Sequence, residues 1–284
     1  MKKFTLLLLV LGTAVSAFAN VSPSEKQALL SLYKSSNGKQ WTKQWDVNAP
    51  VESWYGVQVR DGKVVALQLP NNNLSGELPK EIGNLVNLEN INLFRNSLTG
   101  SLPTSIGKLK SLKSINIAFN KLTGKLPASL AEVTVLQTVE LHMNRISGTL
   151  PADYGKLKNL ETLSLYNNEI EGEIPASYYG MTSIRTLLLS SNKLTGKLSV
   201  DIVNLTSLEN LSLFENNMVG QVPFDLEKLK NLKEMNISYN KFNGVVSKNL
   251  ARLDMMNMTM INEYGVASAL KVDMNKNSAL ASDE

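Results

Sequence analysis

The chain has 284 residues, with 29 basic and 25 acidic side chains, one histidine and no cysteine. The lack of cysteine excludes disulfides, a cysteine nucleophile and the lipid anchor of bacterial lipoproteins. The formal net charge of +4 is too small for the basic surface with which proteins bind nucleic acid.

The first 19 residues have the composition of a signal peptide. Lys2 and Lys3 precede an apolar run over residues 4–15, and residues 17–19 read Ala-Phe-Ala, the small-x-small pattern of a cleavage site. The apolar run is shorter than the ~20 residues that span a bilayer, so a membrane anchor is the less favoured alternative. We predict Sec-dependent export to a secreted, periplasmic or cell-surface location, which leaves 27 basic and 25 acidic residues and a net charge of +2.

Residues 20–63 precede a set of repeats and are expected to form their N-terminal cap, because an uncapped repeat array leaves an apolar edge in water. Ser22 is a candidate helix N-cap, Pro23 stands at the first helical position and Glu25 completes a capping box. The helix should end at Asn37-Gly38.

The cap also holds all three tryptophans, Trp41, Trp45 and Trp54. Their rings could stack on a sugar, or they could form the small apolar core of the cap. We favour the core, which would replace the disulfide of cysteine-bearing caps.

Residues 64–255 repeat a 24-residue pattern eight times. The clearest copy begins at Leu88 and reads Leu-x-x-Ile-x-Leu-x-x-Asn-x-Leu-x-Gly-x-Leu-Pro. A fixed period of this length with this pattern is typical of a leucine-rich repeat solenoid. The copies begin at Val64, Leu88, Leu112, Leu136, Leu160, Ile184, Leu208 and Leu232.

The Leu-x-Gly-x-Leu-Pro segment resembles plant-type leucine-rich repeats, as in receptor-kinase ectodomains and polygalacturonase-inhibiting proteins. The cap resembles that of secreted bacterial leucine-rich repeat proteins, and the Met-Lys-Lys start also favours a bacterial source. The resemblance implies an α/β fold, in which a curved right-handed coil carries a parallel β-sheet on its concave face and short helical turns on its convex face. It also implies extra strand-like structure beside the main sheet. The cysteine-paired caps, transmembrane segment and kinase segment of plant members are not found, so no plant ligand is carried over.

The proline of this segment is replaced at Ser199 and Ser247, where we expect local irregularity in the sixth and eighth coils. From Leu253 the pattern decays. We expect a terminal capping strand within residues 256–264 and a frayed polar tail over residues 265–284.

Three sets of positions recur in every coil. Alternating apolar residues predict one strand that points them into the core: Leu67/Leu69, Ile91/Leu93, Ile115/Ile117, Val139/Leu141, Leu163/Leu165, Leu187/Leu189, Leu211/Leu213 and Met235/Ile237. Asparagines should form a structural ladder that satisfies backbone groups where the chain leaves the strand: Asn72, Asn96, Asn120, Asn144, Asn168, Asn192, Asn216 and Asn240. Glycines are expected in a backbone conformation that other residues resist: Gly76, Gly100, Gly124, Gly148, Gly172, Gly196, Gly220 and Gly244.

Catalysis has little support in the sequence. His142 is the only histidine, and its neighbour in the alternation is Glu140, so a general base would depend on this pair alone. Glu169, Glu171 and Glu173 lack calcium-loop spacing and are taken as a solvated edge. We expect no metal, no cofactor and no enzymatic activity.

The outward face of the predicted sheet carries more information. Neighbouring strands lie ~4.8 Å apart, so Phe94, Phe119, His142, Met143 and Tyr166 should form one patch. Outward apolar clusters usually mark interaction sites. The partner-binding residues that we predict are Phe94, Arg95, Phe119, Glu140, His142, Met143, Tyr166, Leu188, Phe214 and Tyr239.

The predicted function is recognition of a macromolecule by a monomer without a membrane span. A protein is the favoured ligand. The alternative is a polysaccharide, with the same aromatic rings stacked on sugars and Asn92, Asn116 and Glu140 bonded to hydroxyls.

One further column contains charges of alternating sign, which predicts a lateral ladder of exposed ion pairs. Each pair would contribute only ~0–1 kcal/mol. The residues are Glu89, Lys113, Gln137, Glu161, Arg185, Glu209 and Lys233.

Overall fold

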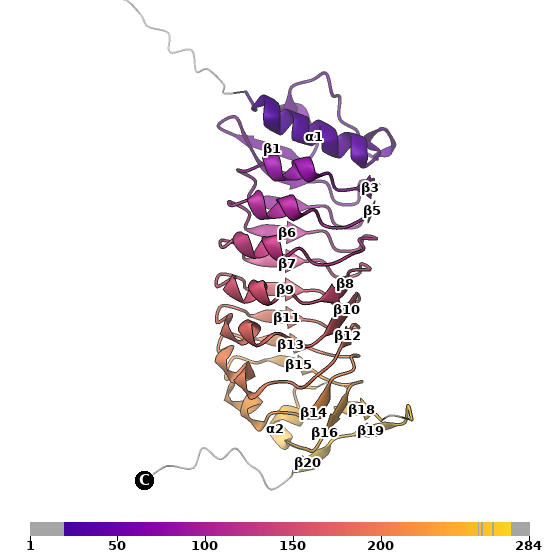
Figure 1. The fold of residues 1–284 in the computed structure, drawn as a ribbon, viewed down its shortest axis with the longest axis vertical. Helices are drawn as coiled ribbons and strands as arrows, with labels where there is room; N and C mark the ends of the chain where they lie inside the picture. Colours follow the sequence, from indigo (N-terminus) through magenta and orange to yellow (C-terminus); the bar gives the residue numbers. More distant parts are fainter. Residues whose placement is uncertain (1–19, 255, 257, 263, 274–284) are drawn as a thin grey trace, which may run out of the picture.

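The computed structural model describes residues 20–254, 256, 258–262 and 264–273. The predicted signal peptide and residues 274–284 of the predicted tail lie outside them. The coils stack along one axis (Figure 1), with the helix α1 (Pro23–Ser35) across one end and the last short strands at the other. Within the described residues, no helix has both the length and the apolar character needed to cross a membrane.

Nine strands form one sheet along the stack, in the order β1-β2-β4-β6-β7-β9-β11-β13-β15. β1 and β2 are antiparallel, and each later pair is parallel, with residues 24 positions apart side by side. The inward residues predicted from the alternation are at most 3% exposed, which confirms the register. The strands are β1 Val57–Arg60, β2 Lys63–Gln68, β4 Asn90–Asn92, β6 Ser114–Asn116, β7 Thr138–Glu140, β9 Thr162–Ser164, β11 Thr186–Leu188, β13 Asn210–Ser212 and β15 Glu234–Asn236.

Short edge strands and 3-10 helices complete the coils, as the plant-type resemblance implied. The helices pack against one another on the side of the stack opposite the main sheet (Figure 1). The edge strands are β3 Ser75–Glu77, β5 Ser97–Thr99, β8 Ser147–Thr149, β10 Glu169–Gly172, β12 Lys193–Leu194, β14 Val219–Gln221 and β16 Lys241–Asn243. The helices are η3 Lys80–Asn84, η4 Thr104–Lys108, η5 Ala128–Glu132, η6 Ala152–Lys156, η7 Ala176–Gly180, η8 Val200–Asn204 and η9 Phe224–Lys228.

The two coils without proline differ from each other. The irregularity expected at Ser199 is wrong, because η8 begins as the other helices do. Ser199 holds φ at −68°, and its Oγ accepts a hydrogen bond from the Asp201 N–H at 3.1 Å. At Ser247 the coil does change, since a short α-helix, α2 (Lys248–Ala251), follows in place of a 3-10 helix. A serine N-cap replaces proline at both positions.

The ladder asparagines link each coil to the one before it. The Nδ2 of Asn120 donates to the carbonyls of Leu93 (3.0 Å) and Ile117 (3.1 Å). Its Oδ1 accepts from the Leu98 N–H at 2.9 Å. The Leu93 carbonyl also accepts from Asn96 at 2.9 Å, so two successive asparagines share one acceptor. Each amide therefore satisfies backbone groups of two coils.

The cap is built on its tryptophans. Trp45 lies between Tyr33 and Trp54, with ring centroids 5.8 and 4.8 Å away, and Trp41 meets it edge-on at 4.9 Å. All three tryptophans are at most 4% exposed, and every indole N–H donates to a backbone carbonyl. Sugar stacking needs an open ring face, so the cap-core interpretation is confirmed. The cap also contains η1 (Gly38–Gln40) and η2 (Val51–Ser53).

The C-terminal end departs from the sequence prediction. A strand does lie within residues 256–264, but this strand, β18 (Thr259–Ile261), pairs with β19 (Ala267–Ala269) outside the main sheet. The frayed tail predicted from residue 265 is wrong as far as residue 273, because β20 (Lys271–Asp273) pairs with β17 (Val245–Ser247). The last coil leaves unpaired backbone groups at its edge; β18 and β20 bond to them, and β19 pairs with β18.

Two core tyrosines in neighbouring coils give a matched test of buried polarity. Tyr154 and Tyr178 are at most 1% exposed. The Tyr154 hydroxyl donates to the Pro127 carbonyl at 3.2 Å, whereas the Tyr178 hydroxyl has no partner among the described residues, and burial raises its pKa well above the usual value. We expect Tyr154→Phe to lower the free energy of unfolding by about 1 kcal/mol and Tyr178→Phe to leave it unchanged or raise it. Urea unfolding of both variants checks this, and equal losses would contradict it.

Candidate functional site

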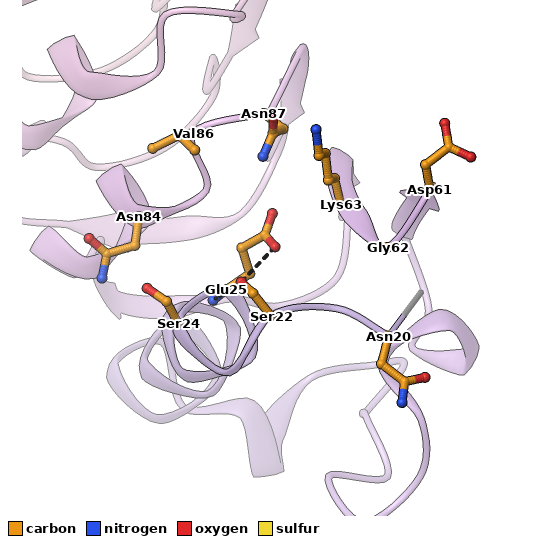
Figure 2. A pocket seen from close by; sticks show the side chains of 10 residues that line it. All are labelled: Asn20, Ser22, Ser24, Glu25, Asp61, Gly62, Lys63, Asn84, Val86 and Asn87. Atoms are coloured by element: carbon orange, nitrogen blue, oxygen red, sulfur yellow. Dashed lines mark hydrogen bonds between the residues drawn. The ribbon is translucent and has the colours of Figure 1, made fainter. Parts of the chain in front are cut away.

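The hollow between the start of α1 and the first coils is a structural junction. It has a volume of about 490 Å³, and Figure 2 shows the Glu25 side chain entering it beside Ser22. Glu25 is only 4% exposed. Its Oε1 accepts from the Val64 N–H at 3.1 Å and its Oε2 accepts from the Ser22 Oγ at 2.8 Å. The carboxylate therefore ties the cap to β2.

The outward face of the nine-stranded sheet, called the sheet face below, carries a continuous row of rings. Phe94 meets Phe119 edge-on with centroids 5.3 Å apart, and Phe119 meets His142 edge-on at 5.5 Å. His142 then stacks on Tyr166 at 4.3 Å, with 12° between the ring planes. We call these four residues the ring row. Four successive coils supply one ring each, so the 24-residue period brings them together.

His142 is more buried than its outward position suggested. It is 9% exposed, and its Nδ1 lies 3.0 Å from the Oγ of Ser164, which is itself 2% exposed. Burial lowers the pKa of His142 below its usual value, which keeps the ring neutral. His142 therefore packs as an internal member of the row, between Phe119 and Tyr166.

Glu140 bonds along its column rather than to His142. Its Oε2 accepts from the Asn116 Nδ2 at 2.7 Å. Burial raises the pKa of Glu140, and the hydrogen bond from Asn116 opposes that rise. The pKa of Tyr166 is also raised, by burial and by the charge of Glu140.

The residue before each ladder asparagine adopts the left-handed backbone conformation, which the sequence did not signal. Values of φ are 52° at Arg95, 55° at Phe119, 56° at Met143 and 57° at Tyr239. Such bulky residues rarely adopt this region. The turn lies beside the asparagine ladder, and from it Phe119 and Tyr239 each pack on a ring of the preceding coil. The Arg95 guanidinium carbon lies 5.5 Å from the Phe94 ring and 5.2 Å from the Phe119 ring.

The remaining predicted residues do not all join this cluster. Met143 is half-buried, and its Sδ accepts from the Asn167 Nδ2 at 2.6 Å. Phe214 and Tyr239 form a separate edge-on pair at 5.2 Å. Leu188 is half-buried on β11, between the ring row and that pair.

Sequence reasoning missed one outward column. The strand register places small hydroxyl residues side by side at the entry of four adjacent strands, all of them half-buried. Period-2 alternation counted back from the recognised columns could have found them. They are Ser114, Thr138, Thr162 and Thr186.

The predicted charge ladder is confirmed in two runs separated by Gln137. In the first, Glu89 pairs with Lys113 at 3.0 Å and with Arg60 from the cap. In the second, Arg185 lies between Glu161 (3.9 Å) and Glu209 (2.8 Å), and Glu209 also pairs with Lys233 at 2.5 Å. These flanking lysines and arginines lower the pKa of Glu89 and of Glu209.

No cluster of three or more metal-ligating side chains occurs in the part of the chain that the structure describes. In the row of acids on β10, Glu169 pairs with Lys193 at 3.0 Å.

Comparison with known families agrees with this architecture. The family model described as leucine-rich repeat region matches residues 139–278, and the one described as leucine rich repeat matches residues 63–85, 87–109 and 111–133. With the parallel sheet and the 24-residue register, these matches decide the fold. The chain is a leucine-rich repeat solenoid. The solenoid is also similar to the ectodomains of plant leucine-rich repeat receptors.

Three solved structures show this similarity. The plant peptide hormone receptor RGFR1, in complex with RGF2, is 34% identical, with a TM-score of 0.66 over 70% of this chain and 32% of that chain. A TDR receptor is 37% identical, with a TM-score of 0.59 over 60% of this chain and 30% of that chain. The ectodomain of the Arabidopsis thaliana receptor kinase GASSHO1/SCHENGEN3, in complex with CASPARIAN STRIP INTEGRITY FACTOR 2, is 26% identical, with a TM-score of 0.72 over 87% and 33%. This solenoid thus spans about a third of the length of the receptor chains that it matches.

Proposed function

We propose that this solenoid is an exported, non-catalytic bacterial protein that binds a protein or peptide ligand on its sheet face as a monomer. The observation that carries the proposal is the ring row, with Arg95 fixed beside Phe94 and Phe119. Two of the receptor ectodomains similar to this solenoid are described in complex with a named ligand, which supports a binding role.

The physical argument rests on preorganisation. Each ring is held by its neighbours in the row and lies two or three residues past the end of a strand of the main sheet, so little side-chain entropy remains to be lost on binding. Aromatic residues and arginine are enriched at the centres of protein interfaces, where a few of them contribute most of the affinity. Asn92 is half-buried on the adjacent column, with its oxygen bonded to the Phe94 N–H, and its amide nitrogen lies beside the rings.

The ring geometry favours a protein over the alternative polysaccharide ligand. Sugar stacking requires a free, flat ring face. His142 and Tyr166 already cover one face of each other, and Phe119 meets both of its neighbours edge-on. The tryptophans, which are the strongest sugar-stacking residues in the chain, are buried in the cap.

A capture experiment with matched variants tests the proposal. The full chain is immobilised and exposed to secreted and cell-surface protein extracts, and captured proteins are identified and then titrated as purified proteins. We expect stoichiometric binding of one partner by the wild type. The variant F94S/F119S/Y166S should lose that binding by at least ~30-fold, because hot-spot residues each contribute 2 kcal/mol or more.

The control variant carries the same number of serines on exposed valines away from the sheet face. It is V86S/V135S/V200S, at positions that are 50%, 39% and 62% exposed. Equal binding by both variants would contradict a site on the sheet face. Binding to a defined polysaccharide with no captured protein would favour the alternative.

Export is tested in the same preparation, where the N-terminus of the exported protein should be Asn20.

A further inference from the structure

Arg95 lies beside the ring row, and the contacts among the four rings do not explain why a cation stands there. It is exposed, and its guanidinium packs against two phenyl rings. Among the described residues, no carboxylate lies within ion-pair distance of it. Arg60 and Arg185, by contrast, each pair with acids of the charge ladder.

The backbone holds Arg95 in place. Its φ of 52° is fixed in the turn, and its N–H donates to the Ala118 carbonyl at 3.0 Å. The next residue, Asn96, bonds through Oδ1 to the N–H groups of Asn72 (3.0 Å) and Leu74 (2.9 Å). The guanidinium is therefore a positioned cation, because both its backbone and its aromatic contacts are set by the fold.

The surroundings of Arg95 are positive. Lys121 and Arg145 are exposed two residues beyond Phe119 and Met143, where the next two coils have turned away from the main strand, and form no ion pair within the described chain. The nearest acid of the neighbouring column, Glu140, is half-buried and bonded to Asn116, and its pKa is raised. Arg95 thus presents unpaired positive charge beside apolar rings, and Lys121 and Arg145 add positive charge just past the turns of the next two coils.

We propose that the ligand is an acidic peptide segment, in which the carboxylate of an aspartate or glutamate side chain binds Arg95 and an adjacent apolar side chain packs on Phe94 and Phe119. The planar guanidinium can donate two parallel hydrogen bonds to one carboxylate, which gives direction as well as charge attraction. The rings leave its outer edge free for those bonds while they orient its plane. Lys121 and Arg145 then favour further acids along the same peptide through longer-range attraction. This inference rests on the proposed function, since it names the ligand chemistry of the same face.

Peptide pools of defined chemistry test the inference. The probe is a fluorescent pool of C-terminally amidated dodecapeptides in which each aspartate or glutamate is flanked by tyrosine or leucine. A second pool replaces every acid by asparagine or glutamine. Using the full-length chain, we expect binding of the acidic pool to exceed that of the amide pool by at least ~10-fold, with an affinity that falls as salt rises.

Three variants separate the possible outcomes. R95Q should bring the ratio of acidic-pool to amide-pool binding close to one, and R95K should keep part of the preference because a point charge remains. K80Q removes one exposed cation from η3, away from the sheet face, and should behave as the wild type.

The results also distinguish this inference from the function on which it rests. Equal binding of both pools by the wild type, lost in F94S/F119S/Y166S, would overturn the acidic preference but leave the sheet face as the binding site. If the preference for the acidic pool survives in R95Q, Arg95 is not the residue that binds the carboxylate. Binding of neither pool would overturn the acidic-peptide inference, and the capture experiment would then judge the proposed function separately.

Discussion

Replacing Asn216 by alanine is expected to lower the free energy of unfolding by about 3 kcal/mol, because it leaves a buried backbone donor without a partner. Asn216 is 8% exposed. Its Oδ1 accepts from the Leu194 N–H at 2.9 Å, and its Nδ2 donates to the carbonyls of Leu189 and Leu213, each at 3.0 Å. The two carbonyls keep a second ladder asparagine each, whereas the Leu194 N–H keeps none. Urea unfolding followed by far-ultraviolet circular dichroism measures the loss.

The neighbouring residue provides a matched control. Asn217 is exposed, and its side chain makes no hydrogen bond in the described structure. Asn217→Ala removes the same side-chain atoms as Asn216→Ala, but from a solvent-exposed position, so it should change the free energy of unfolding by less than ~0.5 kcal/mol. Because all three tryptophans lie in the cap, their fluorescence reports the far end of the stack. Coils contact only their neighbours, so the N216A transition followed by circular dichroism should precede the one followed by fluorescence. Similar losses for both asparagines would show that the ladder does not stabilise the fold.

The asparagine ladder also explains why so much of this fold could be predicted from sequence. A defect in one coil cannot be compensated by distant contacts, so each coil must satisfy its own backbone and the backbone of one neighbour. The same residue types therefore recur at the same positions, and the period of 24 residues reports the register directly. The cap helix was predictable for a related reason, since Ser22, Pro23 and Glu25 act within one turn.

The errors lie where one local interaction can replace another. Ser199 was expected to disturb its coil, but a serine hydroxyl can hold the helix start as well as a proline ring can. The strands β19 and β20 come from a segment without periodicity, and they form because β18 and the last coil offer unpaired backbone groups. Pairing of that kind depends on what the last coil leaves open rather than on the composition of the segment itself.

At the sheet face, the sequence predicted which residues gather but not how deeply each one lies. Alternation predicted that the His142 side chain points outward. His142 lies two residues past the end of β7, however, where side chains of neighbouring coils pack on one another. Ala118 on the previous coil is fully buried, and Ser164 on the next strand lies close enough to bond to the His142 ring. The small size of these two neighbours lets Phe119 and Tyr166 close over the histidine. Period-2 alternation contains no information on that closure.

Replacing Trp45 by alanine is expected to lower the free energy of unfolding by about 4 kcal/mol, the usual cost of deleting a buried tryptophan. Its ring is 4% exposed and stacks on Tyr33 and Trp54, and its Nε1 donates to the Tyr55 carbonyl at 2.8 Å. Loss of the cap core also uncovers the apolar edge of the first coil. Fluorescence of the two remaining tryptophans should therefore change at a lower urea concentration than the circular dichroism of the solenoid, the reverse of the order expected for N216A.

Two further substitutions separate the structural role of Trp45 from a ligand-binding one. Trp45→Phe keeps an aromatic ring in the stack but loses the bond to the Tyr55 carbonyl, so it should cost roughly 2 kcal/mol. Tyr55→Ala removes an aromatic residue of the same cap that is 38% exposed, and should cost less than ~1 kcal/mol. If W45A kept wild-type stability and lost binding to a glycan, the tryptophans would have to open toward a ligand, and the cap would replace the sheet face as the binding site. A cap that melts first, with ligand capture unchanged below its transition, would instead leave recognition with the ring row.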